Sequence, residues 1–291
     1  GGRRNWMNSA LGHSGVTLDS IYRVEDTPSI ELRKHIHPRA DTQSYNDALD
    51  PAYLKNTLAS DSIDYAEAHV IYEEKKAELL RGVAFPRHRY FVLDDRLTAN
   101  DTHTYGWQLH LSKTETGNLS GEPHQLTWAT SNDQQEQVAL GIQMLDQRRN
   151  VNSYDDGPTN YDGLSYPEAV YDHTYLIADE TAKDTQYLTL LDPYKVADGP
   201  LHVETVVEGR VWKIVHSPTE YDLLMSQPAR ASIAFDRIRT DATFLIASID
   251  VIEGQHSLKS VLAKDGTQVQ VDYDVREDLT MTEQSIFHRE F

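Results

Sequence analysis

The sequence predicts a mostly β protein, an antiparallel two-layer β-sandwich of the supersandwich type with little helix. Short runs of alternating apolar and polar residues recur along the chain, and Gly, Pro, Asn and Asp separate them, as is typical of antiparallel strands. More than a dozen such runs are too many for one open twisted sheet, so we expect the strands to stack in layers. The sequence shows no heptad pattern and no internal repeat.

The clearest strand lies around Trp107. Tyr105, Trp107, Leu109 and Leu111 alternate with polar residues, which places the apolar side chains on one buried face. Similar alternation predicts strands over residues 15–18, 66–72, 79–85, 90–94, 125–130, 138–145, 174–178, 187–191, 203–207, 211–215, 231–235, 243–249 and 269–273.

Two segments carry helix signals. Residues 51–60 begin with a proline that follows Asp50, which is suited to an N-cap. Residues 218–226 also begin with a proline, and Ser217 precedes it as a possible cap. Each segment predicts one or two helical turns.

Composition excludes two classes of partner. Against 27 Lys and Arg stand 46 Asp and Glu, and the net charge of −19 argues against nucleic acid, because phosphate contacts need dense positive charge. No apolar run approaches the roughly 20 residues that cross a bilayer, so no membrane partner is expected. The chain has no cysteine, so a metal ion would need His, Asp, Glu or backbone oxygen ligands.

Two segments far apart in the chain carry a recognisable pattern. The first holds Trp6, a run of small residues that ends in His13 and a serine, and a short strand that ends in Asp. The second holds residues 87–95, followed by a His-x-Tyr-x-Trp-x-x-His pattern that starts at His103. Together they resemble the β-rich part of the heparinase II/III-like polysaccharide lyases, which include heparin-type and alginate lyases.

The resemblance is strongest over residues 3–19, fair over 62–112 and faint afterwards. It implies β-elimination of a uronic-acid-containing polysaccharide, such as alginate or a glycosaminoglycan. In that family the tyrosine and histidine that serve as base and acid mostly precede the region matched here. We therefore expect residues 1–291 to be the C-terminal β-sandwich part of a larger lyase, without the catalytic pair, and any internal domain boundary to lie in the Asp- and Tyr-rich stretch 150–172.

The resemblance also implies partners and a location. The partners would be an acidic polysaccharide and an N-terminal helical domain or chain of the same enzyme, in a bacterial periplasm or secreted. A net charge of −19 repels a polyanion, so this reading requires a local cationic cleft; otherwise the acidity is a solubility adaptation. Two alternatives stay open, a non-catalytic carbohydrate-binding sandwich and a structural accessory sandwich.

Zinc is the cofactor that the resemblance implies. The family histidine matched by His13 helps to hold a structural zinc ion, together with a histidine and an aspartate earlier in the chain, so one ligand would lie here. A lone histidine can equally be a hydrogen-bonding residue. Ser14 stands where the family has asparagine. We expect His103 and His110 to order their strand rather than to bind metal.

The other candidate substrate-binding and metal-binding residues each allow two interpretations. Arg3 and Arg4 lie beside the motif and could bind a substrate carboxylate, or be solvated end residues. Trp6 could stack on a sugar or anchor the core. His35 and His37 have the i, i+2 spacing of metal ligands on one strand face, a pattern that is also common in surface loops.

Overall fold

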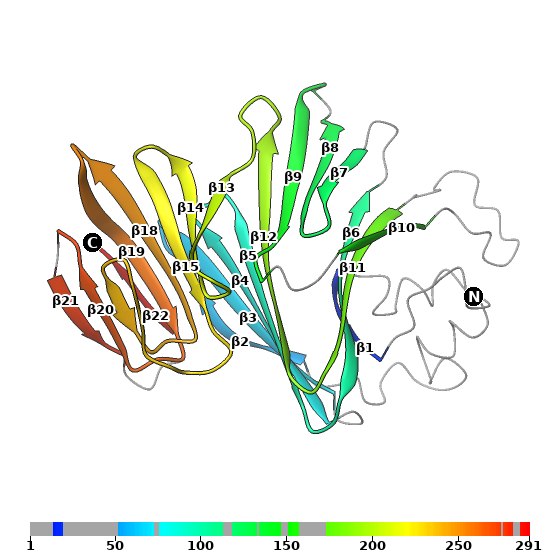
Figure 1. The fold of residues 1–291 in the computed structure, drawn as a ribbon, viewed down its shortest axis with the longest axis horizontal. Coiled ribbons are helices and arrows are strands. Elements are labelled where there is room, and N and C mark those ends of the chain that lie inside the picture. Colours follow the sequence, from blue (N-terminus) through cyan, green and yellow to red (C-terminus); the bar gives the residue numbers. More distant parts are fainter. Residues whose placement is uncertain are drawn as a thin grey trace, which may run out of the picture.

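The computed structural model describes residues 14–19, 52–72, 76–112, 118–132, 134–146, 151–156, 173–274, 276–281 and 286–291. These residues form strands and turns; they include no helix, and so none that could span a membrane. The strands form four antiparallel sheets, which we name A to D and which stack in that order (Figure 1). The predicted mostly β, antiparallel sandwich is confirmed, with four stacked sheets in place of two.

Sheets A and B form the half of the molecule that contains the first strand. Sheet A has the order β1 (Gly15–Leu18), β6 (His103–Ser112), β11 (His173–Ala182), β10 (Asn152–Asp156). Sheet B has the order β2 (Ala52–Leu58), β3 (Ile63–Tyr72), β4 (Ala77–Pro86), β5 (Phe91–Ala99), β12 (Thr185–Lys195), β9 (Gln137–Met144), β8 (Gln125–Ser131), β7 (Asn118–Glu122).

Sheets C and D form the other half. Sheet C has the order β13 (His202–Val207), β14 (Val211–Ser217), β15 (Glu220–Ser226), β18 (Phe244–Ile252), β19 (Gln255–Lys264), β22 (Ile286–Glu290). Sheet D has the order β16 (Ile233–Phe235), β17 (Ile238–Thr240), β20 (Gln268–Asp272), β21 (Arg276–Thr280).

Three apolar clusters fill the spaces between the sheets. Trp107 of sheet A meets Leu97 and Tyr187 of sheet B in the first cluster. Sheets B and C share a second cluster, and sheets C and D a third. Sheets B and C are therefore covered on both faces, which explains why the centre of β18 is a continuous buried run without alternation.

Both predicted helical segments are strands, so those two predictions were wrong. Residues 52–58 form β2, which pairs with β3, and residues 220–226 form β15, which pairs with β14 and β18. Helix propensity is a weak preference, and pairing with neighbouring strands overrides the cap signals here. In β15 the run from Tyr221 to Ser226 is buried on both faces, so no period of two was visible in the sequence.

Buried cations of sheets B and C tie the two sheets together. Lys264 at the end of β19 forms an ion pair with Glu67 of β3, and their side chains are 2% and 0% exposed. Arg87, in the turn after β4, donates from Nε to the Oδ1 atom of buried Asp222 on β15 at 2.8 Å. Each pair joins strands that belong to different sheets, so the pairs help to set how the sheets lie on each other.

Replacing Lys264 by methionine should test the value of the buried ion pair. We expect the free energy of unfolding to fall by about 3–5 kcal/mol, because the Glu67 carboxylate stays buried without its main counter-charge. Urea unfolding at neutral pH measures the change.

Lys195→Met is the matched control. The Lys195 ammonium pairs with Glu136 at 3.0 Å, but its side chain is 59% exposed, so water replaces the lost contact. This variant should unfold at the wild-type urea concentration. Equal losses of unfolding free energy in the two variants would show that burial does not increase the contribution of the Lys264 ion pair.

Candidate functional site

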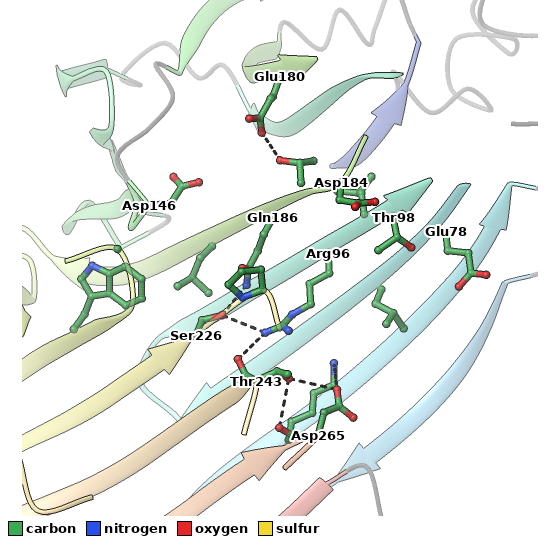
Figure 2. A pocket seen from close by; sticks show the side chains of 18 residues that line it. Glu78, Arg96, Thr98, Asp146, Glu180, Asp184, Gln186, Ser226, Thr243 and Asp265 are labelled. Atoms are coloured by element: carbon green, nitrogen blue, oxygen red, sulfur yellow. Dashed lines mark hydrogen bonds and ion pairs between the residues drawn. The ribbon is translucent and has the colours of Figure 1, made fainter. Parts of the chain in front are cut away.

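A cavity of about 420 Å³ lies between sheets B and C. Figure 2 shows the side chains that surround it. Sheet B supplies the floor, with Leu80 from β4, Arg96 from β5 and Gln186 from β12. Sheet C supplies the wall, with Trp212 from β14 and Lys264 from β19 among its residues. The volume falls in the range of small-molecule sites, so this cavity is the first candidate.

Strand register explains why these floor residues gather. Leu80 is the direct partner of Arg96, and Arg96 is the direct partner of Gln186. Directly paired residues point to the same face of a sheet, so one row across sheet B forms the floor. The row continues outward, since His69 of β3 pairs with Leu80, and Tyr53 of β2 pairs with His69.

Arg96 acts as a clamp between the sheets. Its guanidinium donates to Asp94 Oδ2 at 2.8 Å, and also to Ser226 Oγ at 3.2 Å and the Thr243 carbonyl at 2.9 Å. Gln186 reinforces the clamp by donating from Nε2 to Asp94 Oδ1 and Ser226 Oγ, each at 2.6 Å. The Arg96 side chain is 13% exposed and its charge is matched by Asp94, so it does not offer a free cation to a ligand.

Lys264, the second cation of the cavity, is also neutralised. Its ammonium contacts Glu67 and lies 3.4 Å from Asp265. Burial alone would raise the pKa of the Glu67 carboxyl, but the hydrogen bond and charge of Lys264, with help from Asn56, outweigh it and hold this pKa below its ordinary value. The Tyr65 hydroxyl donates to the oxygen that Lys264 contacts, Glu67 Oε2, at 3.1 Å.

The remaining charges of the cavity are negative. Besides Asp265, its lining includes the carboxylates of Glu78, Asp146, Glu180 and Asp184. Because the two cations are already paired, the electrostatic potential favours an uncharged or cationic ligand over a uronate. The cationic cleft that an acidic polysaccharide requires is therefore not this cavity.

The Arg-His-Arg-Tyr part of the sequence pattern builds a second polar cluster. Asp222 accepts from Arg87, from Tyr90 at 2.8 Å and from His216 Nε2 at 2.8 Å. Burial alone would raise the pKa of the Asp222 carboxyl, but His216 and Arg87 hold it below its ordinary value. His216 Nδ1 is buried without a hydrogen-bond partner. The cluster is closed to ligands and serves to join sheets B and C.

Adjacent left-handed residues mark the same turn. Arg87 and His88 have φ angles of 50° and 51°, a region that residues other than glycine and asparagine seldom occupy. These φ angles suit the two central residues of a tight β-turn, which the Arg89 N–H closes by donating to the Pro86 carbonyl at 3.0 Å. The contacts of Arg87 with Asp222 and Asp250 hold it in place.

Several sequence candidates fall outside the described residues. These are His13 as a zinc ligand, Arg3, Arg4 and Trp6 as substrate-binding residues, and the pair His35 and His37. Within the part of the chain that the structure describes, no group of three or more His, Asp or Glu side chains is placed to hold a metal ion.

The two halves of the sequence pattern meet in sheet A. β1 pairs with β6, and Val16 is the direct partner of Trp107. His103 contacts Asp19 Oδ2 at 2.8 Å, and the backbone N–H of His110 donates to Ser14 Oγ at 3.1 Å. Both residues thus connect β6 to the β1 segment, in keeping with the ordering role expected for them.

Sequence reasoning missed the residues of the cavity. Arg96 follows two aspartates in the middle of the otherwise mainly apolar β5, and Lys264 ends the apolar run 261–263 of β19; charges in such places signal buried ion pairs. This signal identifies the cation, but it does not show which residues form the ion pair with it. Glu67 lies nearly two hundred positions from Lys264, and no local pattern connects them.

The fold is similar to that of a part of known heparan sulfate lyases. The structure of heparan sulfate lyase HepC from Pedobacter heparinus matches 88% of this chain with a TM-score of 0.50 and 15% identity. A heparinase III gene product matches 78% of it with a TM-score of 0.50 and 14% identity. The match covers 31% and 30% of those two longer chains. No protein-family profile matches the sequence, and no curated protein is significantly similar to it.

Acid should weaken the protein through Glu67. A carboxylate whose pKa is lowered on folding adds stability above its unfolded pKa, and this stability is lost as the pH falls. We therefore expect the free energy of unfolding of the wild type to drop between about pH 5 and pH 3, and to drop less in a Glu67→Gln variant. Other carboxylates are common to both proteins, so the difference between them isolates Glu67. Parallel curves from urea unfolding across this pH range would contradict the assignment.

Proposed function

We propose that the chain is the β-sandwich part of a polysaccharide lyase, which cleaves a uronic-acid-containing polysaccharide, alginate or a glycosaminoglycan, by β-elimination. The observation that carries the proposal is the fold, shared over 88% of this chain with a heparan sulfate lyase. The pairing of β1 with β6 adds support, because it brings together the two segments in which the sequence resembles lyases.

The reaction sets clear chemical demands. The uronate carboxylate must be neutralised, a base must remove the proton at C5, and an acid must protonate the departing glycosidic oxygen. The cations of the described cavity are already paired with carboxylates, so it does not meet the first demand. In the proposal, the base and acid come from an N-terminal helical domain or chain of the same enzyme, which acts in a bacterial periplasm or after secretion.

The proposed contribution of this chain is a wall of the substrate cleft. Arg3 and Arg4 would contact uronate carboxylates, Trp6 would lie against a sugar ring, and His13 would supply one ligand of a structural zinc ion. Metal analysis of the full-length protein tests the last assignment, since a His13→Ala variant should lose its zinc. Unchanged zinc content in that variant would refute it.

The activity is tested by incubating the full-length protein with alginate, heparan sulfate, chondroitin sulfate and hyaluronan. Elimination leaves an unsaturated uronate, whose ultraviolet absorbance should rise with at least one polymer. In the presence of that polymer, Arg3→Ala and Arg4→Ala should raise KM more than they lower kcat, because they remove binding contacts.

The alternatives give different results in the same experiment. A carbohydrate-binding accessory sandwich would bind a polymer without forming product. A structural accessory sandwich would neither bind nor cleave. An unchanged absorbance with all four polymers would refute the lyase proposal.

A further inference from the structure

A chain of hydrogen bonds links a tyrosine, a histidine and a glutamate on the outer strands of sheet B. The Tyr53 hydroxyl lies 2.6 Å from His69 Nδ1, and His69 Nε2 lies 3.0 Å from Glu78 Oε2. The three residues come from β2, β3 and β4, so three neighbouring strands fix their relative positions. Tyr53 and His69 also meet edge to face, with ring centroids 5.1 Å apart.

The carboxylate decides the direction of these bonds. An ionised Glu78 can only accept, so a neutral His69 carries its proton on Nε2 and presents an unprotonated Nδ1. Tyr53 must then donate its hydroxyl proton to Nδ1. This is the arrangement of an activated nucleophile: a hydroxyl, a base within hydrogen-bond reach, and a third group that orients the base.

Exposure separates this group from a buried structural pair. Tyr53 is 48% exposed, and the His69 side chain behind it is 12% exposed. Tyr221 and His256 make a similar contact at 2.8 Å, but Tyr221 is 5% exposed and cannot meet a ligand. Tyr53 thus combines a hydroxyl that is hydrogen-bonded to a histidine with a side chain that is about half exposed.

The same group borders the cavity of sheets B and C. Tyr53 and His69 continue the row of paired residues whose inner members form the cavity floor, and Glu78 itself lines the cavity. A ligand in the cavity would meet several carboxylates, which accept hydrogen bonds from hydroxyl groups and repel anions. The ligand class favoured by this lining is an uncharged polyhydroxylated molecule.

We propose that Tyr53, His69 and Glu78 form a nucleophilic site that hydrolyses carboxylic esters of uncharged polyhydroxylated alcohols. This ester reaction is independent of the proposed lyase activity, because no uronate takes part in it.

The reaction proceeds in two balanced steps. Tyr53 Oη bonds to the acyl carbon while its proton moves to His69 Nδ1, and the bond from that carbon to the alcohol oxygen breaks. The alcohol leaves with the proton from His69. Water then attacks the acyl-tyrosine and gives its proton to Nδ1; the bond between the acyl carbon and Tyr53 Oη breaks, the carboxylic acid departs, and the phenol recovers its proton.

The test uses p-nitrophenyl acetate as the probe and the full chain as the protein. Nitrophenolate release gives the turnover, and mass spectrometry of the peptide that carries Tyr53 shows whether the acetyl group passes through its oxygen. We expect Tyr53 to be acetylated faster than N-acetyltyrosine amide in solution. Tyr53→Phe should abolish the site-dependent release, and His69→Gln should slow acetylation of Tyr53 about 100-fold, because general-base help is lost.

Two further variants complete the test. Glu78→Gln should slow acetylation by a smaller factor, since it weakens only the orientation of His69. Tyr194→Phe, on β12 and outside this group, should match the wild type. Circular dichroism checks that each variant is folded. If His69→Gln does not fold, Tyr53→Phe still tests the proposal, because it removes only the hydroxyl and keeps the aromatic ring.

The direction in which His69→Gln changes the acetylation rate of Tyr53 distinguishes a catalytic role of His69 from a purely structural one. A merely structural hydrogen bond occupies the phenol and protects it, so its removal in His69→Gln would raise acetylation of Tyr53. That rise would overturn the proposal. Acetylation of wild-type Tyr53 at the rate of the free amide, or unchanged turnover in Tyr53→Phe, would also overturn it.

Discussion

Buried ion pairs hold sheets B and C in one relative position. Lys264 of sheet C meets Glu67 of sheet B, and Arg87, in the turn after β4 of sheet B, meets Asp222 of sheet C. Removing a charge from water is costly, so such pairs add little net stability compared with an apolar core. Their main effect is to fix the relative position of the two sheets, because any slip of one sheet over the other would separate a buried cation from its carboxylate.

The cavity follows from this arrangement. Beyond Arg96, the row of residues that forms the cavity floor on sheet B continues outward through Leu80 to His69 and Tyr53. Carboxylates neutralise the charges of Arg96 and Lys264, and the lining of the cavity contains more acidic than basic residues. A single row of paired residues thus changes character along its length, from a clamp at Arg96 to an exposed tyrosine at the sheet edge.

The shared fold and the local chemistry point to different parts of the molecule. The likeness to heparan sulfate lyases covers most of this chain but about a third of those enzymes, so it describes a scaffold. Sheet A, where β1 meets β6, carries the part of the lyase-like sequence pattern that starts at His103 and the short strand of its first segment. The Tyr53 group lies on sheet B instead, beside a cavity whose charge disfavours uronates. The sequence pattern and the Tyr53 group therefore involve different parts of the fold.

The β class and most strand positions could be predicted from the sequence, because the alternation of side chains is a local property with a period of two. Residues 15–18 are predicted and found as a strand with the same bounds. Alternation fails where a strand is buried on both faces, as in β15, and where pairing overrides helix signals, as in β2. Only the tertiary structure decided the stacking of four sheets and the partners of the buried charges. Arg96 reaches Ser226 across 130 positions, and contacts at that separation depend on how whole sheets pack, which no short stretch of sequence records.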